Sequence, residues 1–155
     1  MTSQFSQRAT AAPPRLWTLW LTVVSCGVMF AGLGMVFAPD LTRRGFSLLL
    51  YADAHHLDTW GVEAGSYISF VHAVLGAVLF GWGAALLCVV RGAFMRGERG
   101  GWNAIAVSAM AWFIPDTVYS LWSWVWQNAL LNLVIALLLA ISLLATYRTF
   151  HAPRR

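Results

Sequence analysis

Asp116 is the strongest candidate for a functional side chain, because it is a carboxylate in an apolar run long enough to cross a bilayer. A carboxylate inside hydrocarbon is costly, so it needs polar partners or a functional reason. Ser120 follows it at i+4 spacing, and Trp112 and Ser108 precede it at the same spacing, so the four residues share one face of a predicted helix. This pattern predicts a polar site inside a membrane domain.

Five further polar residues are candidates to join Asp116 in such a site. They lie in the same run or in the neighbouring apolar runs, and they are His72, Tyr119, Ser120, Asn128 and Asn132. Polar residues inside a membrane commonly line ligand pathways, so the six together predict a binding site for a small or lipid-like ligand. His72 and Asp116 also suit an acid–base pair, which is an enzymatic alternative. No nucleophile or second catalytic carboxylate accompanies them, and we therefore expect a protein that is more readily a binding protein than an enzyme.

The other chemistry-bearing residues indicate structural roles. His55, His56 and Asp58 are close in sequence, but zinc needs a geometry that adjacent histidines rarely share, and no second ligand pair follows. We expect a solvated polar turn there and leave metal binding open. Cys26 and Cys88 lie inside apolar runs and read as small packing residues. A haem site would need a second intramembrane histidine, so no cofactor is expected.

The composition and the apolar runs of the chain predict the helices that position these residues. The 155-residue chain is 59% hydrophobic and 10% charged, against about 25% charged residues in an ordinary soluble domain. Four runs reach the length of a spanning helix, and they cover residues 16–37, 67–90, 102–122 and 128–147. The sequence predicts an all-α membrane protein, with one domain at 16–147 that forms an up-down four-helix bundle. A lead at 1–15 and a tail at 148–155 flank it.

Two features between and along these helices predict further structure. The segment 45–51 is too short to span and too apolar for an open loop, so a short interfacial helix is expected in the first external loop. Small residues at four-residue spacing allow helices to approach closely in lipid. On that basis the expected packing residues are Gly27, Ala31, Ala77, Gly81 and Ala85.

Arginine placement predicts the orientation. All ten basic residues are arginines; eight lie in the lead, the 91–101 turn and the tail, and two lie in the 38–66 loop. The positive-inside rule then places both termini in the cytoplasm and the 38–66 loop outside. The same distribution at helix ends argues against nucleic acid as a partner, and the lipid bilayer is the expected surrounding.

The last part of the chain resembles a known pattern. The pattern consists of Gly76-Ala77 with Gly81-Trp82-Gly83, then Trp112-Phe113-x-x-Asp116-Thr117-x-x-Ser120, then Asn128-x-x-x-Asn132. This combination is similar to small uncharacterised bacterial four-helix integral membrane proteins, over about the last ninety residues. The resemblance implies a four-helix fold in a bacterial inner membrane and assigns no activity. An accessory subunit that packs through its glycine faces, against itself or a larger membrane partner, is the alternative to ligand binding.

The orientation is tested by reporter fusions. Fusions after residue 155 and within 91–101 are expected to report a cytoplasmic position, and fusions near residue 55 an external one, because the arginines are retained on the cytoplasmic side. An external carboxyl terminus would contradict the orientation.

Overall fold

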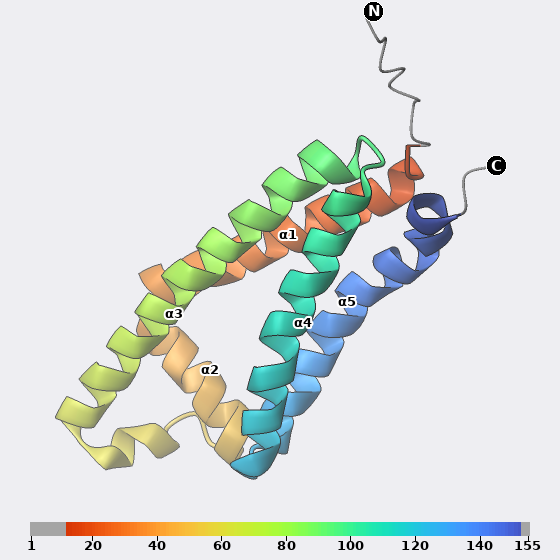
Figure 1. Ribbon diagram of the computed structural model, residues 1–155. Helices are drawn as coiled ribbons and strands as arrows, with labels where there is room; N and C mark the ends of the chain where they lie inside the picture. The colour runs from red at the N-terminus through yellow and green to blue at the C-terminus, as the bar shows by residue number, and fades with distance from the viewer. Residues whose placement is uncertain (1–11, 153–155) are drawn as a thin grey trace, which may run out of the picture.

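The computed structural model describes residues 12–152, and this part of the chain consists of helices joined by short connections (Figure 1). In chain order the elements are α1 (Arg15–Phe37), α2 (Pro39–Tyr51), the short 3₁₀ helix η1 (His56–Trp60), α3 (Val62–Val89), the π turn η2 (Val90–Phe94), α4 (Arg99–Trp122) and α5 (Trp126–His151). Within residues 12–152 there is no β-strand. The expectation of an all-α fold is confirmed for this part of the chain.

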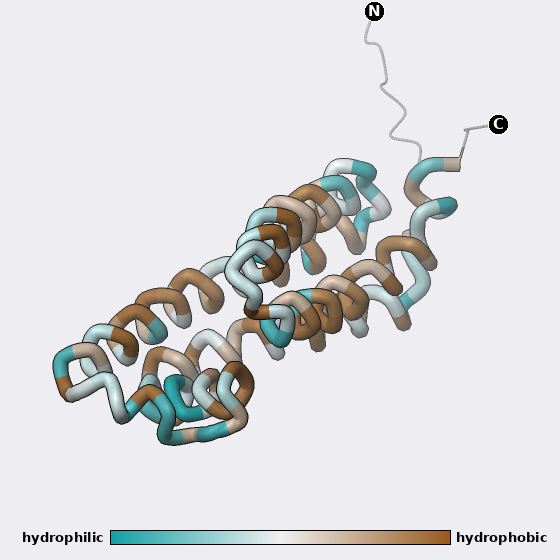
Figure 2. The backbone as a smooth tube through the Cα atoms, turned by 90° about the horizontal axis from the view of Figure 1, so that it is seen from below, coloured by the Kyte–Doolittle hydropathy of each residue, from teal (hydrophilic) through white to brown (hydrophobic). Residues whose placement is uncertain are grey.

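Four helical stretches are long and apolar enough to cross a membrane: Arg15–Phe37, Val62–Phe94, Arg99–Trp122 and Trp126–His151. They match the four expected spans and extend beyond several of them, because polar residues at the ends continue the helical hydrogen bonding. Figure 2 shows hydrophobic residues along the helix shafts and hydrophilic residues near the helix ends and in the connection after α2. The chain therefore has the make-up of a multi-pass membrane protein.

The long helices form two antiparallel pairs, α1 with α3 and α4 with α5 (Figure 1). The pairs come together at the end of the molecule where α1 begins and α5 ends. A buried core holds them there, with side chains from α1, α3, η2, α4 and α5; its members are Leu21, Leu86, Val90, Phe94, Ile105, Ala109, Leu139, Leu143 and Phe150. The Trp20 indole donates to the Leu138 carbonyl at 2.7 Å and adds a polar link between α1 and α5.

The tight turn between α3 and α4 completes that end. The amide of Met95 donates to the carbonyl of Val90 at 3.1 Å, which is the wider hydrogen bond of a π turn. A Cβ on Gly101 would lie 2.5 Å from the Phe94 backbone nitrogen, so only glycine fits this crossing. Arg99 donates from Nε to the Phe150 carbonyl at 2.6 Å and thereby caps the last turn of α5.

Helix α2 begins directly after α1 and runs further back in sequence than the expected 45–51 segment. Pro39 stands at the helix start, where its missing amide costs nothing, and Asp40 in the first turn complements the helix dipole. The helix ends at Tyr51, and the residue that follows it, Ala52, has a left-handed φ of 57°. The expected helix in this loop is present, and its interfacial position stays a prediction.

The packing of α1 on α3 uses a different glycine face from the expected one. A Cβ on Gly32 would lie 2.5 Å from the Gly76 carbonyl oxygen, and a Cβ on Gly83 would lie 3.0 Å from the Ser25 carbonyl oxygen. Gly76 and Gly83 are seven residues apart, or about two turns, so they share one face.

The expectation for the other set is wrong within this chain. Gly27, Ala31, Ala77, Gly81 and Ala85 are all exposed, and a Cβ on Gly27 or Gly81 would meet no atom within 4 Å. Successive residues are rotated by about 100° around a helix, so the face that includes Ala77 points in a different direction from the face that includes Gly76. Four-residue spacing identified a small-residue face without identifying which face meets the neighbouring helix.

Gly32→Ala is expected to destabilise the chain in detergent by about 1–3 kcal/mol, because the new methyl group meets backbone atoms that cannot move aside. Gly27→Ala is the matched control on the same helix, where the added methyl group meets open space. Thermal melting of the two variants measures the difference, and equal melting temperatures would contradict the close contact between α1 and α3.

Candidate functional site

A polar cluster joins α4 to α5 around Asp116. The Asn128 amide nitrogen donates to Asp116 Oδ1 at 3.0 Å and to Ser120 Oγ at 2.8 Å. Ser120 in turn lies 2.7 Å from the Asp116 carbonyl oxygen and 3.3 Å from its Oδ1. The short connection between α4 and α5 brings these residues opposite one another. The expectation that Asp116 lies beside Asn128 is confirmed.

One turn along α5, Asn132 makes a second link to α4. Its side-chain amide donates to Thr117 Oγ1 at 3.4 Å, and the residue is only 2% exposed. Asn128 and Asn132 thus both face α4, because residues four apart share one face of a helix. These contacts satisfy polar groups between two helices and are typical of inter-helix hydrogen bonding in membranes.

His72 and Tyr119 do not join this cluster. Tyr119 is 73% exposed, because the 100° rotation from Ser120 takes it away from α5. His72 Nδ1 lies 2.8 Å from the Ile68 carbonyl oxygen of its own helix, and its ring centroid lies 5.1 Å from that of Phe46 in α2.

The distance of His72 from the cluster follows from how α3 packs. Helix α3 packs against α1 and α2, and its ring contact with α4 is the pair Trp82 and Trp112, at 5.6 Å between centroids. Trp82 is ten residues from His72, or about 15 Å along the helix. Among residues 12–152, His72 and Asp116 share no hydrogen bond, ion pair or ring contact, so the expected six-residue pocket and the acid–base pair are not formed as one group.

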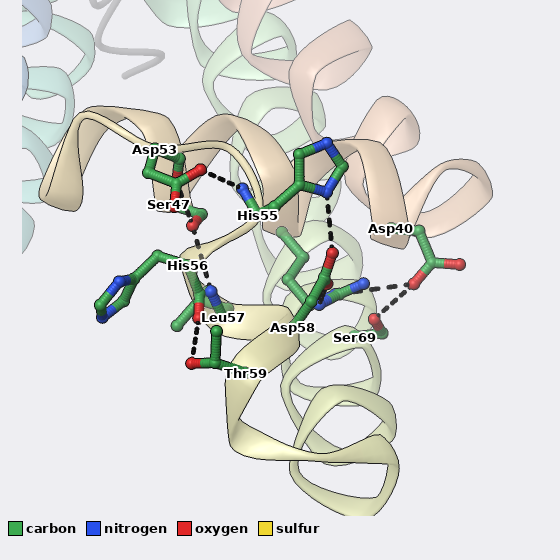
Figure 3. A network of polar contacts seen from close by, with 10 residues as sticks. Asp40, Ser47, Asp53, His55, His56, Leu57, Asp58, Thr59 and Ser69 are labelled. Carbon is green, nitrogen blue, oxygen red and sulfur yellow. Dashed lines mark hydrogen bonds and ion pairs between the residues drawn. The ribbon is translucent and has the colours of Figure 1, made fainter.

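A second polar network lies between α2, η1 and α3, and Figure 3 shows it from close by. The Arg43 guanidinium pairs with the Asp58 carboxylate, which also contacts His55 Nδ1 at 2.8 Å. Asp40 accepts a hydrogen bond from Ser69 at 2.7 Å and lies 3.8 Å from Arg43 Nε. The network ties the loop after α2 to the first turns of α3.

Sequence reasoning missed Arg43 in this network, and with it Asp40 and Ser69. The Arg43 side chain is only 12% exposed, and its buried Nε has no hydrogen-bond partner among the described residues. Burying a guanidinium is costly unless carboxylates offset the charge, and here Asp40 and Asp58 do so. The i, i+3 spacing of Asp40 and Arg43 was a signal for one of these two pairs; the pairing with Asp58 depends on the fold of the loop.

The electrostatics of the network centre on Asp58. The hydrogen bond with the His55 imidazole, followed by the hydrogen bond from Arg43, holds the pKa of the Asp58 carboxyl below its ordinary value. Asp58 is therefore a carboxylate at neutral pH, and it keeps the Arg43 guanidinium in place.

A cavity of about 450 Å³ opens beside this network. Its lining is a mixture of charged, hydroxyl and small residues: Pro39, Asp40, Arg43, Asp58, Gly61, Val62, Gly65, Ser66 and Ser69. The volume falls within the range of about 300–1,000 Å³ that small-molecule sites have. One cation and two carboxylates at its wall can meet both an anionic and a cationic group of a ligand.

The two adjacent histidines point apart, as Figure 3 shows. His55 contacts Asp58, whereas His56 stacks on the Tyr51 ring at 4.2 Å between centroids. Among residues 12–152, no three histidine, cysteine or acidic side chains are grouped as ligands for a metal ion. Within the described chain this loop is built as a hydrogen-bonded turn.

Comparison with family models, with curated proteins and with solved structures gave no match. The resemblance of the last part of the chain to small bacterial four-helix membrane proteins thus stays a prediction.

Asp58→Asn is expected to lower the stability of the chain at neutral pH. It is also expected to make that stability depend less on pH in the acidic range. The native carboxyl has the lower pKa, so its stabilising effect is present above the ordinary carboxyl pKa and is lost as pH falls through the native value. Melting in detergent between about pH 7 and about pH 3 spans this change. Glu63→Gln, an exposed carboxyl nearby, is the control; an equal response of both variants would contradict the role of Asp58.

Proposed function

We propose that this chain is a multi-pass membrane protein that binds a small polar or lipid-like ligand in the cavity between α2, η1 and α3. The observation that carries the proposal is the largely buried Arg43, held by two carboxylates at the wall of a cavity of about 450 Å³. Stability alone does not call for such an arrangement, because the Asp40 and Asp58 side chains are 76% and 39% exposed, and ion pairs with exposed partners contribute little to stability.

The chemistry of the wall indicates what the ligand carries. A guanidinium recognises phosphate or carboxylate groups, and Asp40, which is 76% exposed, can accept from an ammonium or hydroxyl group. Ser66 adds a hydroxyl that has no hydrogen-bond partner within residues 12–152. A zwitterionic molecule or a zwitterionic lipid headgroup is the best complement to this set.

The surroundings favour a ligand taken from the membrane surface. The cavity lies beside the first turns of α3, whose next turns expose large apolar side chains such as Tyr67 and Phe70. The arginine distribution supports placing this end outside a bacterial inner membrane, with both termini in the cytoplasm. A headgroup in the cavity would then leave its apolar part along α3.

Substitutions that fill the cavity or remove its cation test this function. Ser66→Phe fills the space without breaking a hydrogen bond made within residues 12–152, and Arg43→Gln removes the guanidinium. Native mass spectrometry of the chain released from membranes into mild detergent is expected to show a bound adduct that both variants lose. For Arg43→Gln the affinity for the ligand is expected to fall about tenfold or more, since a hydrogen bond to a charged group contributes about 1.5–3 kcal/mol.

Two matched variants control the experiment. Ser66→Ala leaves the cavity open, and Arg44→Gln removes an exposed neighbouring arginine. Both are expected to keep the adduct. Retention of every adduct by Ser66→Phe would contradict ligand binding in this cavity.

An accessory role is the second candidate, and the outward small-residue face of α3 favours it. Ala77, Gly81 and Ala85 are exposed, and the space beside Gly81 is open. Such a face allows a helix of another chain to approach closely. Gly81→Leu would leave the chain's own packing intact, so a change in its size in detergent would support this role.

A further inference from the structure

An apolar groove runs between α4 and α5 on a different side of the molecule from the Arg43 cavity. Its volume is about 330 Å³, and its wall includes Trp102, Ala106 and Met110 from α4 and Leu137, Ala140 and Leu144 from α5. The alanines leave room between the two helices, and Met110, Leu137 and Leu144 are exposed at the rim. The groove is therefore open to the surroundings of the two helices.

The length of the groove matches one leaflet of a bilayer. Its lining extends from Trp102 to Phe113 on α4 and from Leu133 to Leu144 on α5. Eleven residue steps correspond to about 16 Å at 1.5 Å per residue. One leaflet contributes about 15 Å of hydrocarbon, so a single lipid acyl chain fits along the groove.

Positive charge marks one end of the groove. Arg148 follows Leu144 by four residues and therefore lies on the same side of α5, and Arg99 precedes Trp102 by three residues on α4. Arg99 is fixed there by its bonds to the carbonyls of Phe150 and Ala152, at 2.6 and 3.4 Å. Arg148 is exposed and has no hydrogen bond or ion pair with another residue of the described chain.

Aromatic residues close the same end and hold its shape. The Trp102 indole donates to the Leu143 carbonyl at 3.0 Å, and its ring lies 5.6 Å from Tyr147 and 4.7 Å from His151 between centroids. Tryptophan and tyrosine are the side chains that prefer the boundary between hydrocarbon and headgroups. The groove thus runs from an end with the residues of a membrane interface toward the apolar middle of α4 and α5. Figure 1 shows these two helices side by side along their length.

We propose that the α4/α5 groove binds an anionic phospholipid, with one acyl chain between the two helices and the phosphate at Arg99 and Arg148. Charge complementarity selects the anionic headgroup: the acidic residue nearest in sequence to this end, Glu98, is already paired with Arg96. The arginine distribution assigns this end to the cytoplasmic side, where anionic headgroups attract basic residues. The site is separate from the Arg43 cavity in residues and in ligand charge.

Lipid titration of the purified full chain in mild detergent, followed by native mass spectrometry, tests the proposal. Phosphatidylglycerol is expected to bind more tightly than phosphatidylcholine. Arg148→Gln is expected to weaken phosphatidylglycerol binding by about fivefold and to leave phosphatidylcholine unchanged, as removal of one basic residue near a headgroup implies. The matched control is Arg91→Gln, an exposed arginine at the same end but on η2.

A second pair of variants tests the position of the acyl chain. Ala140→Leu narrows the groove and is expected to weaken binding of both lipids, whereas Ala85→Leu on the exposed face of α3 is expected to change neither. Inorganic phosphate is expected not to displace the lipid.

Several results would overturn the proposal. Equal weakening by Arg148→Gln and Arg91→Gln would show diffuse attraction to the basic end, and displacement by inorganic phosphate would show a site for a free anion. Unchanged binding by a folded Ala140→Leu variant would place the acyl chain elsewhere. If Ala140→Leu does not fold, the comparison of Arg148→Gln with Arg91→Gln decides alone. A Ser66→Phe variant that keeps phosphatidylglycerol separates this site from the Arg43 cavity.

Discussion

Close backbone contact between α1 and α3 is the constraint on which the arrangement of this chain depends. Lipid offers apolar helices no hydrophobic reason to associate, so packing and hydrogen bonds must hold them together. Gly32, Gly76 and Gly83 bring the two backbones within contact distance. Since α1 and α3 are then fixed side by side, the chain between them must turn back at one end. That constraint creates the α2–η1 segment, and with it the cavity beside Arg43.

The second helix pair is held by different means. Alanines between α4 and α5 leave a groove, and hydrogen bonds supply the specificity that close contact supplies in the first pair. Asn128 and Asn132 reach across from α5, while Trp102 and Arg99 reach across from α4 near the other end. A pair linked by side-chain hydrogen bonds tolerates an unfilled groove. This explains why the apolar groove lies between α4 and α5.

The sequence predicted the elements better than it predicted their faces. Hydrocarbon thickness determines span length, so the four spans could be read from apolar runs. The Asp116 and Asn128 contact was also predictable, because a short turn allows few arrangements of α4 and α5. The choice between the Gly76/Gly83 face and the Ala77/Gly81/Ala85 face depends on a rotation of about 100°. That rotation is set by neighbouring helices, and His72 was misplaced for the same reason.

Arg43 and Arg148 show why residue type alone could not identify the sites. Both are arginines near helix ends, yet Arg43 is largely buried between two carboxylates, and Arg148 is exposed with no partner within the described chain. The surroundings of Arg43 carry a net negative charge, which favours a ligand that brings its own cation beside its anion. The surroundings of Arg148 are positive, which favours an anion alone. Because the two arginines lie at opposite ends of the helices, each leaflet would meet a different charge pattern. The two proposed sites would thereby select different headgroups on the two sides of a membrane.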